Sequence, residues 1–303
     1  MALPLLLVPS DPLTPRLPDP HFRREADAAD GAGLDVAVID HDAILAGDVP
    51  AAVRRVLRSD APRPAWYRGW MLPAAAYALL ATALEAKGVR LLTNPDAYRT
   101  AHELPGWYDR FTSLTPATVW SPWGPGRLPT AADVGPLVEA LGGGPGVVKD
   151  YMKSRKHEWY EACYIPELTD VAGATRVVAR MVELQEDALA GGIVVRAFEQ
   201  FEADAGGRSR EVRVWWVEGA AVLTTAHPDA VSADAEPVPG EVYDAVGASV
   251  QALGAPFVTT DVAPRTDGAW RVIEVGDGQV SELPAGQDLA PLLGALSAVR
   301  VTP

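Results

Sequence analysis

Short apolar runs alternate with polar, helix-compatible segments over the N-terminal third of the chain. Residues 3–8 (LPLLLV) and 34–40 (LDVAVID) are apolar, and the acid-rich segment 21–32 between them fits a helix. A third run, AWYRGWM at 65–71, precedes an alanine- and leucine-rich helical pattern over 74–87. A strand, a crossover helix and a second strand form a parallel unit, so the pattern predicts a small open α/β domain. This segment has no G-x-G-x-x-G turn, and nothing in it indicates dinucleotide binding.

The middle of the chain opens with the proline- and glycine-rich residues 116–129, which indicate a linker between lobes. We expect a short helix over 130–141, then a glycine-rich turn. The turn leads into GVVKDYMKS, residues 146–154, which we predict to be a strand. Alternate side chains of a strand share a face, so Lys149 and Lys153 should project together.

Basic residues are concentrated at the end of this predicted strand. They are Lys149, Lys153, Arg155, Lys156 and His157. The whole chain has a net charge of −14 and a pI near 4.8, which argues against general nucleic-acid binding because that function needs a basic surface. In so acidic a chain, a basic segment beside a glycine-rich turn favours binding of an anion. The alternative is a solvated basic edge that protects a strand.

Two later segments contain arginines whose role the local sequence leaves open. Arg196 ends the apolar run IVVRA, which follows an amphipathic helix predicted over 172–190. It is either a strand-end charge in solvent or a phosphate or substrate contact. The segment SREVRVWWVEGAAVLTTAH predicts a hairpin that turns at a Glu-Gly dipeptide, with Glu211 and Arg213 on one face. These two residues could form a simple surface ion pair worth under about 1 kcal/mol.

The stretch 257–283 shows the strongest hairpin signal in the chain. Two β-runs are joined at Asp267-Gly268, a dipeptide favoured in two-residue turns because both central positions need positive φ. Pro264 cannot donate a ladder hydrogen bond, so a wider loop is the alternative.

A two-residue turn at this position pairs Asp261 directly with Glu274 across the hairpin. Like charges that face each other destabilise a sheet, and a hard divalent cation such as Mg²⁺ compensates for them. Asp277, just beyond the second run, could add a third oxygen. The alternative is a solvated acidic hairpin in an acidic protein.

Composition narrows the class of protein. With 303 residues and 48% hydrophobic residues, the chain can bury a substantial core and divide into two or three lobes. No apolar run is long enough to cross a bilayer, so we expect no membrane partner. The single cysteine, Cys163, rules out an internal disulfide and fits a reducing cytoplasm; in such a chain it is more often a packing residue than a nucleophile.

Several motifs, taken in order, resemble the ATP-grasp superfamily and one of its clades, a group of predicted carboxylate-amine ligases named for two arginines and a lysine. The motifs are YRGWM at 67–71, VVKDYMKSRKHEW at 147–159, VVRAF at 194–198, EVRVWW at 211–216, DVA at 261–263 and VIEVGDGQVSELP at 272–284. The resemblance implies a mixed α/β fold with a pre-ATP-grasp domain over 1–115, a small lid lobe over 116–198 and an antiparallel lobe over 199–303. ATP and Mg²⁺ would bind between the last two.

The same resemblance implies roles for residues that match the motifs. Lys149 corresponds to the strand lysine on the nucleotide phosphates, and Arg196 lies by the hinge that meets the adenine. Arg213 would face the γ-phosphate or an acyl-phosphate, while Asp261 and Glu274 correspond to the magnesium carboxylates. The nucleotide-binding residues implied are Lys149, Lys153, Ala197, Phe198, Glu199 and Glu211, with Ala197 and Phe198 on the adenine.

The chain departs from the commoner ATP-grasp pattern in two places. Most members have Glu-x-Asn at the second metal position, whereas here Glu274 is followed by Val275-Gly276. Asp277 would then take over the oxygen ligand of the missing asparagine. The glycine-rich phosphate loop of the usual lid is also absent, and the segment 153–157 stands in its place with side-chain cations.

The activity implied is ATP-dependent ligation of a carboxylate to an amine through an acyl-phosphate, with small molecules or peptides as substrates. Arg68 and Arg155 would hold substrate, and His157 would be either a base for the amine or a polar contact. Two alternatives remain: a non-catalytic nucleotide- or peptide-binding module of the same fold, and a phosphotransferase. The sequence does not indicate an oligomeric state.

Overall fold

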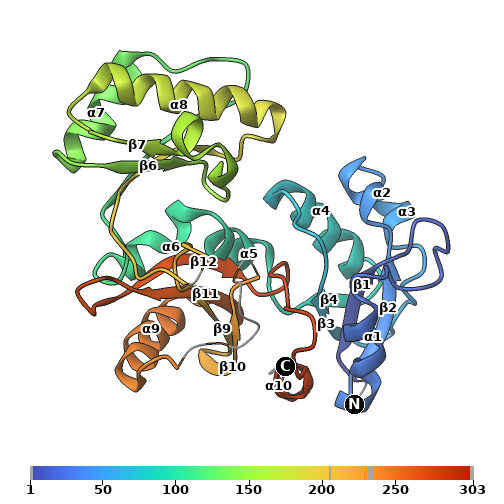
Figure 1. The fold of residues 1–303 in the computed structure, drawn as a ribbon. Helices are drawn as coiled ribbons and strands as arrows, with labels where there is room; N and C mark the ends of the chain where they lie inside the picture. The colour runs from blue at the N-terminus through green and yellow to red at the C-terminus, as the bar shows by residue number, and fades with distance from the viewer. Residues whose placement is uncertain (1–2, 205, 229, 231–234, 236, 301–303) are drawn as a thin grey trace. The chain divides into compact units, whose positions relative to one another are not determined.

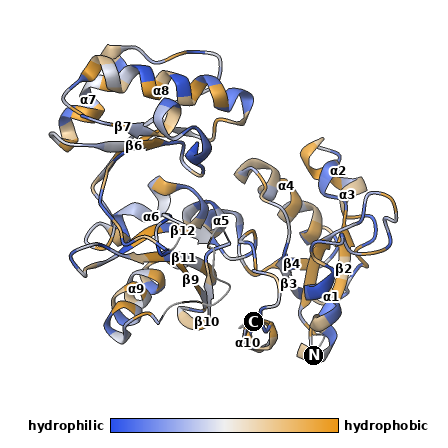
Figure 2. Ribbon diagram, viewed as in Figure 1, coloured by the Kyte–Doolittle hydropathy of each residue, from blue (hydrophilic) through white to orange (hydrophobic). Residues whose placement is uncertain are grey.

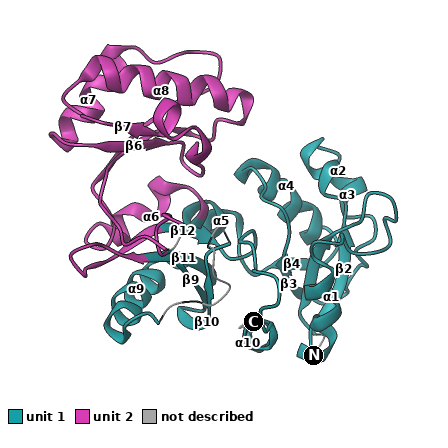
Figure 3. Cartoon of the chain, in the orientation of Figure 1, with its two compact units in different colours: residues 1–101, 211–262, 274–303 teal, residues 102–210, 263–273 magenta. Residues whose placement is uncertain are grey.

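The computed structural model describes residues 3–204, 206–228, 230, 235 and 237–300. The chain forms two compact units (Figure 3). The first unit comprises residues 1–101, 211–262 and 274–303, and the second comprises 102–210 and 263–273. Three four-stranded sheets account for the strands described below. The lobe boundaries expected at residues 115 and 198 stay predictions.

A parallel sheet of order β2-β1-β3-β4 forms the N-terminal part of the first unit (Figure 1). The apolar runs of the sequence form its strands, because both faces of the sheet are buried and each strand can be apolar throughout. This part of the predicted α/β fold is confirmed. Its elements are β1 (Leu5–Pro9), α1 (Arg23–Ala29), β2 (Asp35–Ile39), α2 (His41–Leu45), α3 (Val49–Ala52), β3 (Arg63–Tyr67), α4 (Ala74–Glu85), β4 (Val89–Leu91) and α5 (Pro95–His102).

An antiparallel sheet of order β10-β9-β11-β12 forms the rest of the first unit, and the hairpin at its tip, residues 263–273, belongs to the second. Its elements are β9 (Val212–Val217), β10 (Ala220–Ala226), α9 (Gly240–Leu253), β11 (Phe257–Pro264), β12 (Trp270–Asp277) and, after the sheet, α10 (Ala290–Ala298). The predicted Glu218-Gly219 turn is present, with φ of 51° and 77°. Trp66 of the parallel sheet packs in one cluster with Trp215 and Phe257, so the two sheets of this unit share a core.

The β11–β12 hairpin differs from the expected two-residue turn. Arg265 N–H donates to the carbonyl of Ala269 at 2.8 Å, so the loop has three residues, and Gly268 supplies the positive φ of 86°. At the other end, Gly278 N–H donates to the carbonyl of Phe257. Eight positions separate Phe257 from Arg265 and nine separate Ala269 from Gly278, so β12 carries one extra residue, a β-bulge.

The second unit holds an antiparallel sheet of order β5-β8-β6-β7, with α7 and α8 on one face of it (Figure 1). Figure 2 shows hydrophilic and hydrophobic residues interleaved along α8, as an amphipathic helix requires. Asp170 caps α8 by accepting from Gly173 N–H at 2.9 Å. The elements are α6 (Leu104–Phe111), β5 (Thr118–Pro122), α7 (Ala131–Leu141), β6 (Gly146–Lys149), β7 (Tyr164–Ile165), α8 (Val171–Gln185) and β8 (Gly192–Ala197), with short helical turns at Lys156–Glu158, Trp159–Cys163 and Glu186–Ala188.

The strand predicted over 146–154 ends at Lys149. Asp150 stops it, because its carboxylate accepts the backbone N–H groups of Met152 and Lys153 and closes a turn. The alternation that should have placed Lys149 and Lys153 on one strand face is therefore wrong. Among the described residues, no helix combines the length and apolarity that crossing a bilayer requires.

Candidate active site

The first unit places a buried ion pair on adjacent strands of its antiparallel sheet. Arg213 of β9 lies opposite Asp261 of β11. Its Nε lies 2.8 Å from Oδ1 of Asp261, and its Nη2 lies 2.9 Å from Oδ2. Burial alone would lower the pKa of Arg213, but the carboxylate of Asp261, with Glu274 and Glu211, raises it above the ordinary value. The guanidinium is thus a fixed positive charge among carboxylates.

His227 joins this pair from the end of β10. Its Nε2 lies 3.6 Å from Oδ2 of Asp261 and 3.8 Å from Oε2 of Glu211. Its backbone N–H donates to the carbonyl of Glu211. One ligand atom from each of these three residues lies within 4.8 Å of the others, and all three side chains are at most 13% exposed. We call Glu211, His227 and Asp261 the β9–β11 cluster.

The place of His227 in this cluster could not be resolved from the hairpin pattern alone. Counting from the Glu218-Gly219 turn pairs Glu211 with Ala226. The structure has a β-bulge between Ala221 and Leu223, which moves the register by one residue and brings His227 opposite Glu211. A bulge of this kind depends on side-chain packing and does not follow from periodicity.

Glu274 lies on β12 and adds a further negative charge near the cluster. It is half-buried, and its carboxylate is one of the groups that raise the pKa of Arg213. Val272 and Val275 are buried whereas Ile273 and Glu274 are both half-buried, which breaks the alternation of a strand and places the β12 bulge at this point. Carboxylate and imidazole groups at these separations fit a divalent cation, because two ligands each ~2.1 Å from one ion lie roughly 3 to 4 Å apart.

Asp277 does not fit the metal role predicted for it. It is fully buried, and its Oδ1 accepts from the backbone N–H and the Nε2 of Gln279. Gln279 Nε2 also donates to the hydroxyl of Tyr77. Burial raises the pKa of Asp277 to about 7, so this carboxyl is easily neutralised. Among the described residues it is not part of the β9–β11 cluster.

Arg68 is also placed differently from the prediction that it holds a substrate carboxylate. It is 1% exposed, and its Nε and Nη2 donate to the two oxygens of Glu25 at 2.6 and 2.8 Å. Its Nη1 donates to the carbonyls of Gly278, Gln279 and Ser281. The guanidinium therefore binds a carboxylate of its own chain and fixes the segment after β12.

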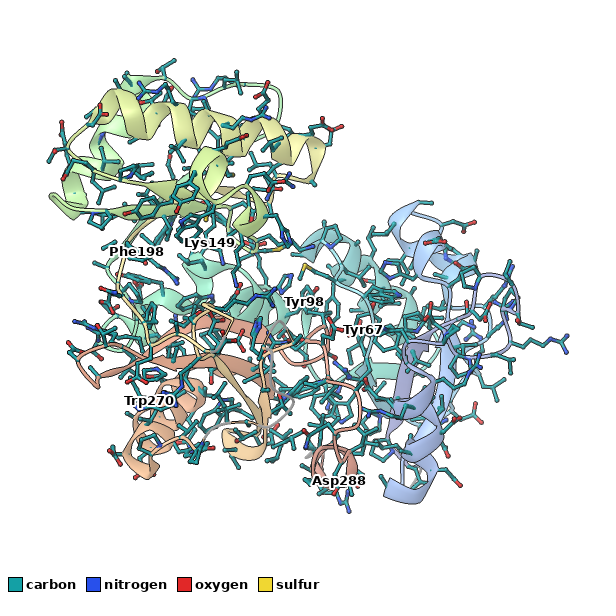
Figure 4. All side chains as sticks on the ribbon, in the orientation of Figure 1. Tyr67, Tyr98, Lys149, Phe198, Trp270 and Asp288 are labelled. Carbon is teal, nitrogen blue, oxygen red and sulfur yellow. The ribbon has the colours of Figure 1, made fainter. Side chains whose placement is uncertain are left out.

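In the second unit, Lys149 ends β6 and is 9% exposed (Figure 4). Lys153 and His157 are exposed beyond the Asp150 turn, and Arg155 pairs with Glu158 at 3.2 Å. Only the exposed side chains of this basic segment are positioned to meet a ligand without rearrangement. Arg155 would first have to leave Glu158.

Arg196 of β8 is buried rather than solvated. Its Nε donates to Oγ1 of Thr118 at 3.1 Å, and its Nη1 donates to the carbonyl of Ile273 at 2.6 Å. Its guanidinium also lies 5.9 Å from the ring centre of Trp107. Since Ile273 directly precedes Glu274, these contacts indicate a positioning role for Arg196 and do not favour the direct phosphate contact that the motif implies.

The segment after β8 was expected to meet adenine. The backbone N–H groups of Ala197 and Phe198 already donate to the carbonyls of Ala117 and Pro145, so only carbonyls and side chains are left to bind a base. Glu199 accepts from Arg271 at 3.0 Å and lies 3.4 Å from Arg265. Its predicted nucleotide contact would compete with both arginines.

Phe198 belongs to an aromatic cluster that the sequence reasoning missed. Trp159 and Tyr164 stack at 5.4 Å between ring centres, and Phe198 packs edge-on against both, at 6.2 and 5.5 Å (Figure 4 labels Phe198). Such rings offer a flat apolar surface to a base. The only signal in the sequence is the density of aromatic residues in WYEACY. Cys163, in the same segment, is buried, and burial raises the pKa of its thiol to about 11, so it is no activated nucleophile.

Comparison with known proteins agrees with this geometry. The model of an ATP-grasp domain, family 3 of the clade named for two arginines and a lysine, matches residues 140–296. Among solved structures, the D-cycloserine synthetase DcsG is 17% identical with a TM-score of 0.63, over 97% of this chain and 98% of that one. A RimK domain ATP-grasp protein from Sphaerobacter thermophilus DSM 20745 is 15% identical with a TM-score of 0.59, over 97% and 98%.

The ATP-grasp ligase PsnB, solved with a minimal precursor, Mg and ADP, is 13% identical with a TM-score of 0.57, over 96% of each chain. No curated protein sequence matches the chain. At these identities the structural likeness shows the fold, and the family match covers more than half of the chain. The chain belongs to this ATP-grasp domain family, the third of the two-arginine, one-lysine clade, and has the ATP-grasp fold.

Proposed function

We propose that this protein is an ATP-dependent ligase that joins a carboxylate to an amine through an acyl-phosphate intermediate. The observation that carries the proposal is the buried Arg213–Asp261 pair with Glu211, His227 and Glu274 around it, in a chain of the ATP-grasp family. Phosphoryl transfer asks a protein mainly for positioning and for charge neutralisation, and this set supplies both.

The reaction needs no nucleophile from the protein. A substrate carboxylate oxygen attacks the γ-phosphorus of ATP, and ADP leaves. The amine then attacks the acyl carbon, phosphate leaves with the acyl C–O bond electrons, and the amine nitrogen loses a proton. A divalent cation held by Asp261 and Glu274 would neutralise charge on the transferring phosphoryl group. Arg213 stays positively charged throughout, and Asp261 fixes the orientation of its guanidinium.

The second unit would contribute the nucleotide contacts. We assign the phosphates to Lys149, with Lys153 as an exposed second cation, and the adenine to the aromatic cluster of Trp159, Tyr164 and Phe198. Glu211, implied as a nucleotide contact, instead joins the metal side of the site. Arg155 and His157 remain proposed acceptor contacts.

The substrate classes follow from the neighbours only as a proposal. One is a synthetase of the small molecule D-cycloserine, and another was solved with a minimal precursor. Both a small amine and a peptide side chain therefore belong in the test.

The test incubates the protein with MgATP and with pooled amino acids, small carboxylates and peptides. We expect ADP and phosphate to appear only when acceptors are present, together with a product whose mass equals acid plus amine minus water. Asp261→Asn should lower the rate by roughly a hundredfold or more, because it removes charge where the phosphoryl group is stabilised. Asp267→Asn is the matched control, since that carboxylate lies in the exposed hairpin loop.

The other outcomes assign other functions. ATP binding without ADP formation under every acceptor would indicate a non-catalytic module. A stable phosphorylated product with no amide would indicate a phosphotransferase.

A further inference from the structure

We infer that His227 is a ligand of the divalent cation, and that its imidazole nitrogen takes the place of the asparagine missing after Glu274. The site would then bind a first-row transition ion such as Mn²⁺ in preference to Mg²⁺. This inference rests on the proposed function only for the use of the ion; the binding itself is a property of the apoprotein.

The ligand geometry is built by three neighbouring strands. Nε2 of His227 lies between the two carboxylates, 3.6 Å from Asp261 and 3.8 Å from Glu211. Its position is fixed, because the β10 bulge sets the register and its backbone N–H bonds to Glu211. A ring nitrogen held between two carboxylate oxygens at these separations can replace an amide oxygen as a ligand.

The charges of the group also suit a divalent cation. Glu211, Asp261 and Glu274 contribute three negative charges and Arg213 one positive charge, so the four side chains sum to −2 when the imidazole is neutral. The side chains of Asp261 and Arg213 are only 4% and 13% exposed, so solvent screens this charge weakly. A bound dication would bring the sum to zero.

The nitrogen ligand decides the metal preference. Carboxylates and water suit Mg²⁺, and imidazole suits transition ions, which bind nitrogen more strongly in the order Mn²⁺, Fe²⁺, Co²⁺, Ni²⁺, Cu²⁺. The metal site predicted from sequence had oxygen ligands only. The β9–β11 cluster offers mixed ligands, so we expect Mn²⁺ to bind the apoprotein at least about tenfold more tightly than Mg²⁺.

The test titrates the full-length protein with Mn²⁺, without nucleotide, and follows bound ion by electron paramagnetic resonance. Pulsed spectra should show the ¹⁴N coupling of a directly bound imidazole, which changes to ¹⁵N coupling when the histidines are labelled. His227→Gln should abolish the coupling and weaken Mn²⁺ binding at least about tenfold. His21→Gln, which alters an exposed histidine packed on Phe22 and Trp70, should change neither.

Each other outcome overturns the inference. Mn²⁺ binding without imidazole coupling in the wild-type protein would show an all-oxygen site, and coupling that survives in His227→Gln would identify another histidine. Absence of Mn²⁺ binding would leave the cluster as an ion-pair network. The labelled wild-type protein provides the decisive spectrum even if the variant fails to fold. Because no ATP is present, ligase turnover with an all-oxygen site, or a nitrogen-ligated ion without turnover, separates this inference from the proposed function.

Discussion

A single buried carboxyl, Asp277, shows how far environment can change the role of a residue. In the sequence it stands two positions from Val275 and is interpreted as a loop oxygen near the metal. In the structure it is fully buried beside Gln279, and burial raises its pKa to about 7. Arg68 acts in the opposite direction but does not overcome the cost of burial. A carboxyl in this setting stabilises the fold in its neutral form.

We therefore expect Asp277→Asn to remove a pH dependence of stability. Between the ordinary pKa of 3.8 and the folded pKa of about 7, the folded protein keeps a proton that the unfolded chain releases. The free energy of unfolding contributed by Asp277 thus falls as pH rises through this window and levels off above it. Asparagine has no proton to release. The variant should gain stability relative to wild type between pH 4 and 7, on the order of 4 kcal/mol in full.

Urea unfolding of both proteins across this pH range measures the difference. Asp267→Asn, in the exposed hairpin loop, should show no change of this size. A difference between Asp277→Asn and wild type that stays constant with pH would mean that the carboxyl is already ionised in the folded protein.

At the scale of the element, the pattern of apolar residues predicted the strands and their order but not their register. The runs that became β1 and β2 were recognisable because a buried parallel strand is apolar throughout. The bulges in β10 and β12 add one residue each, and no periodicity indicates them. Asp261, Glu274 and Arg213 could be predicted because their motif spacing survives a bulge. His227 and the aromatic cluster depend on packing across strands and could not.

The turn at the end of β6 is the element that Asp150 determines. Its carboxylate accepts from the backbone N–H groups of Met152 and Lys153 and from Nε2 of Gln185 at 2.7, 2.5 and 2.7 Å, and Ala190 N–H lies 3.3 Å away. Burial raises the pKa of Asp150, and these donors oppose the rise. The carboxylate thus joins the turn to the segment after α8.

Asp150→Ala should destabilise the second unit by about 3 kcal/mol, since several buried donors lose their acceptor. Hydrogen exchange of residues 150–156 should accelerate, and the KM for ATP should rise more than kcat falls, because Lys149 and Lys153 flank the turn. Asp150→Asn keeps one acceptor oxygen and should show a smaller effect on each measurement. Equal effects of the two substitutions would show that size, and not hydrogen bonding, is what the turn requires.

At the scale of the whole molecule, each unit has its own buried core. One cluster around Leu80 and Val89 and another around Trp66 and Phe257 lie wholly in the first unit. A third, centred on Val148, Val178 and other residues of α7, α8 and the second sheet, lies wholly in the second unit. A core closed within one unit allows that unit to open without exposing the other.

Val178→Ala tests this independence. Val178 is fully buried in α8, so the substitution should cost about 2 to 3 kcal/mol through lost packing and the cavity it leaves. Because the cost falls on the second unit alone, hydrogen exchange followed by mass spectrometry should accelerate in peptides from residues 102–210, while peptides from β1 and β3 keep wild-type rates. Val89→Ala, an equally buried valine of the first unit, should produce the reverse pattern. Acceleration of both units by either substitution would mean that the chain unfolds as one cooperative body, and nucleotide contacts in the second unit could then not loosen without loss of the metal site in the first.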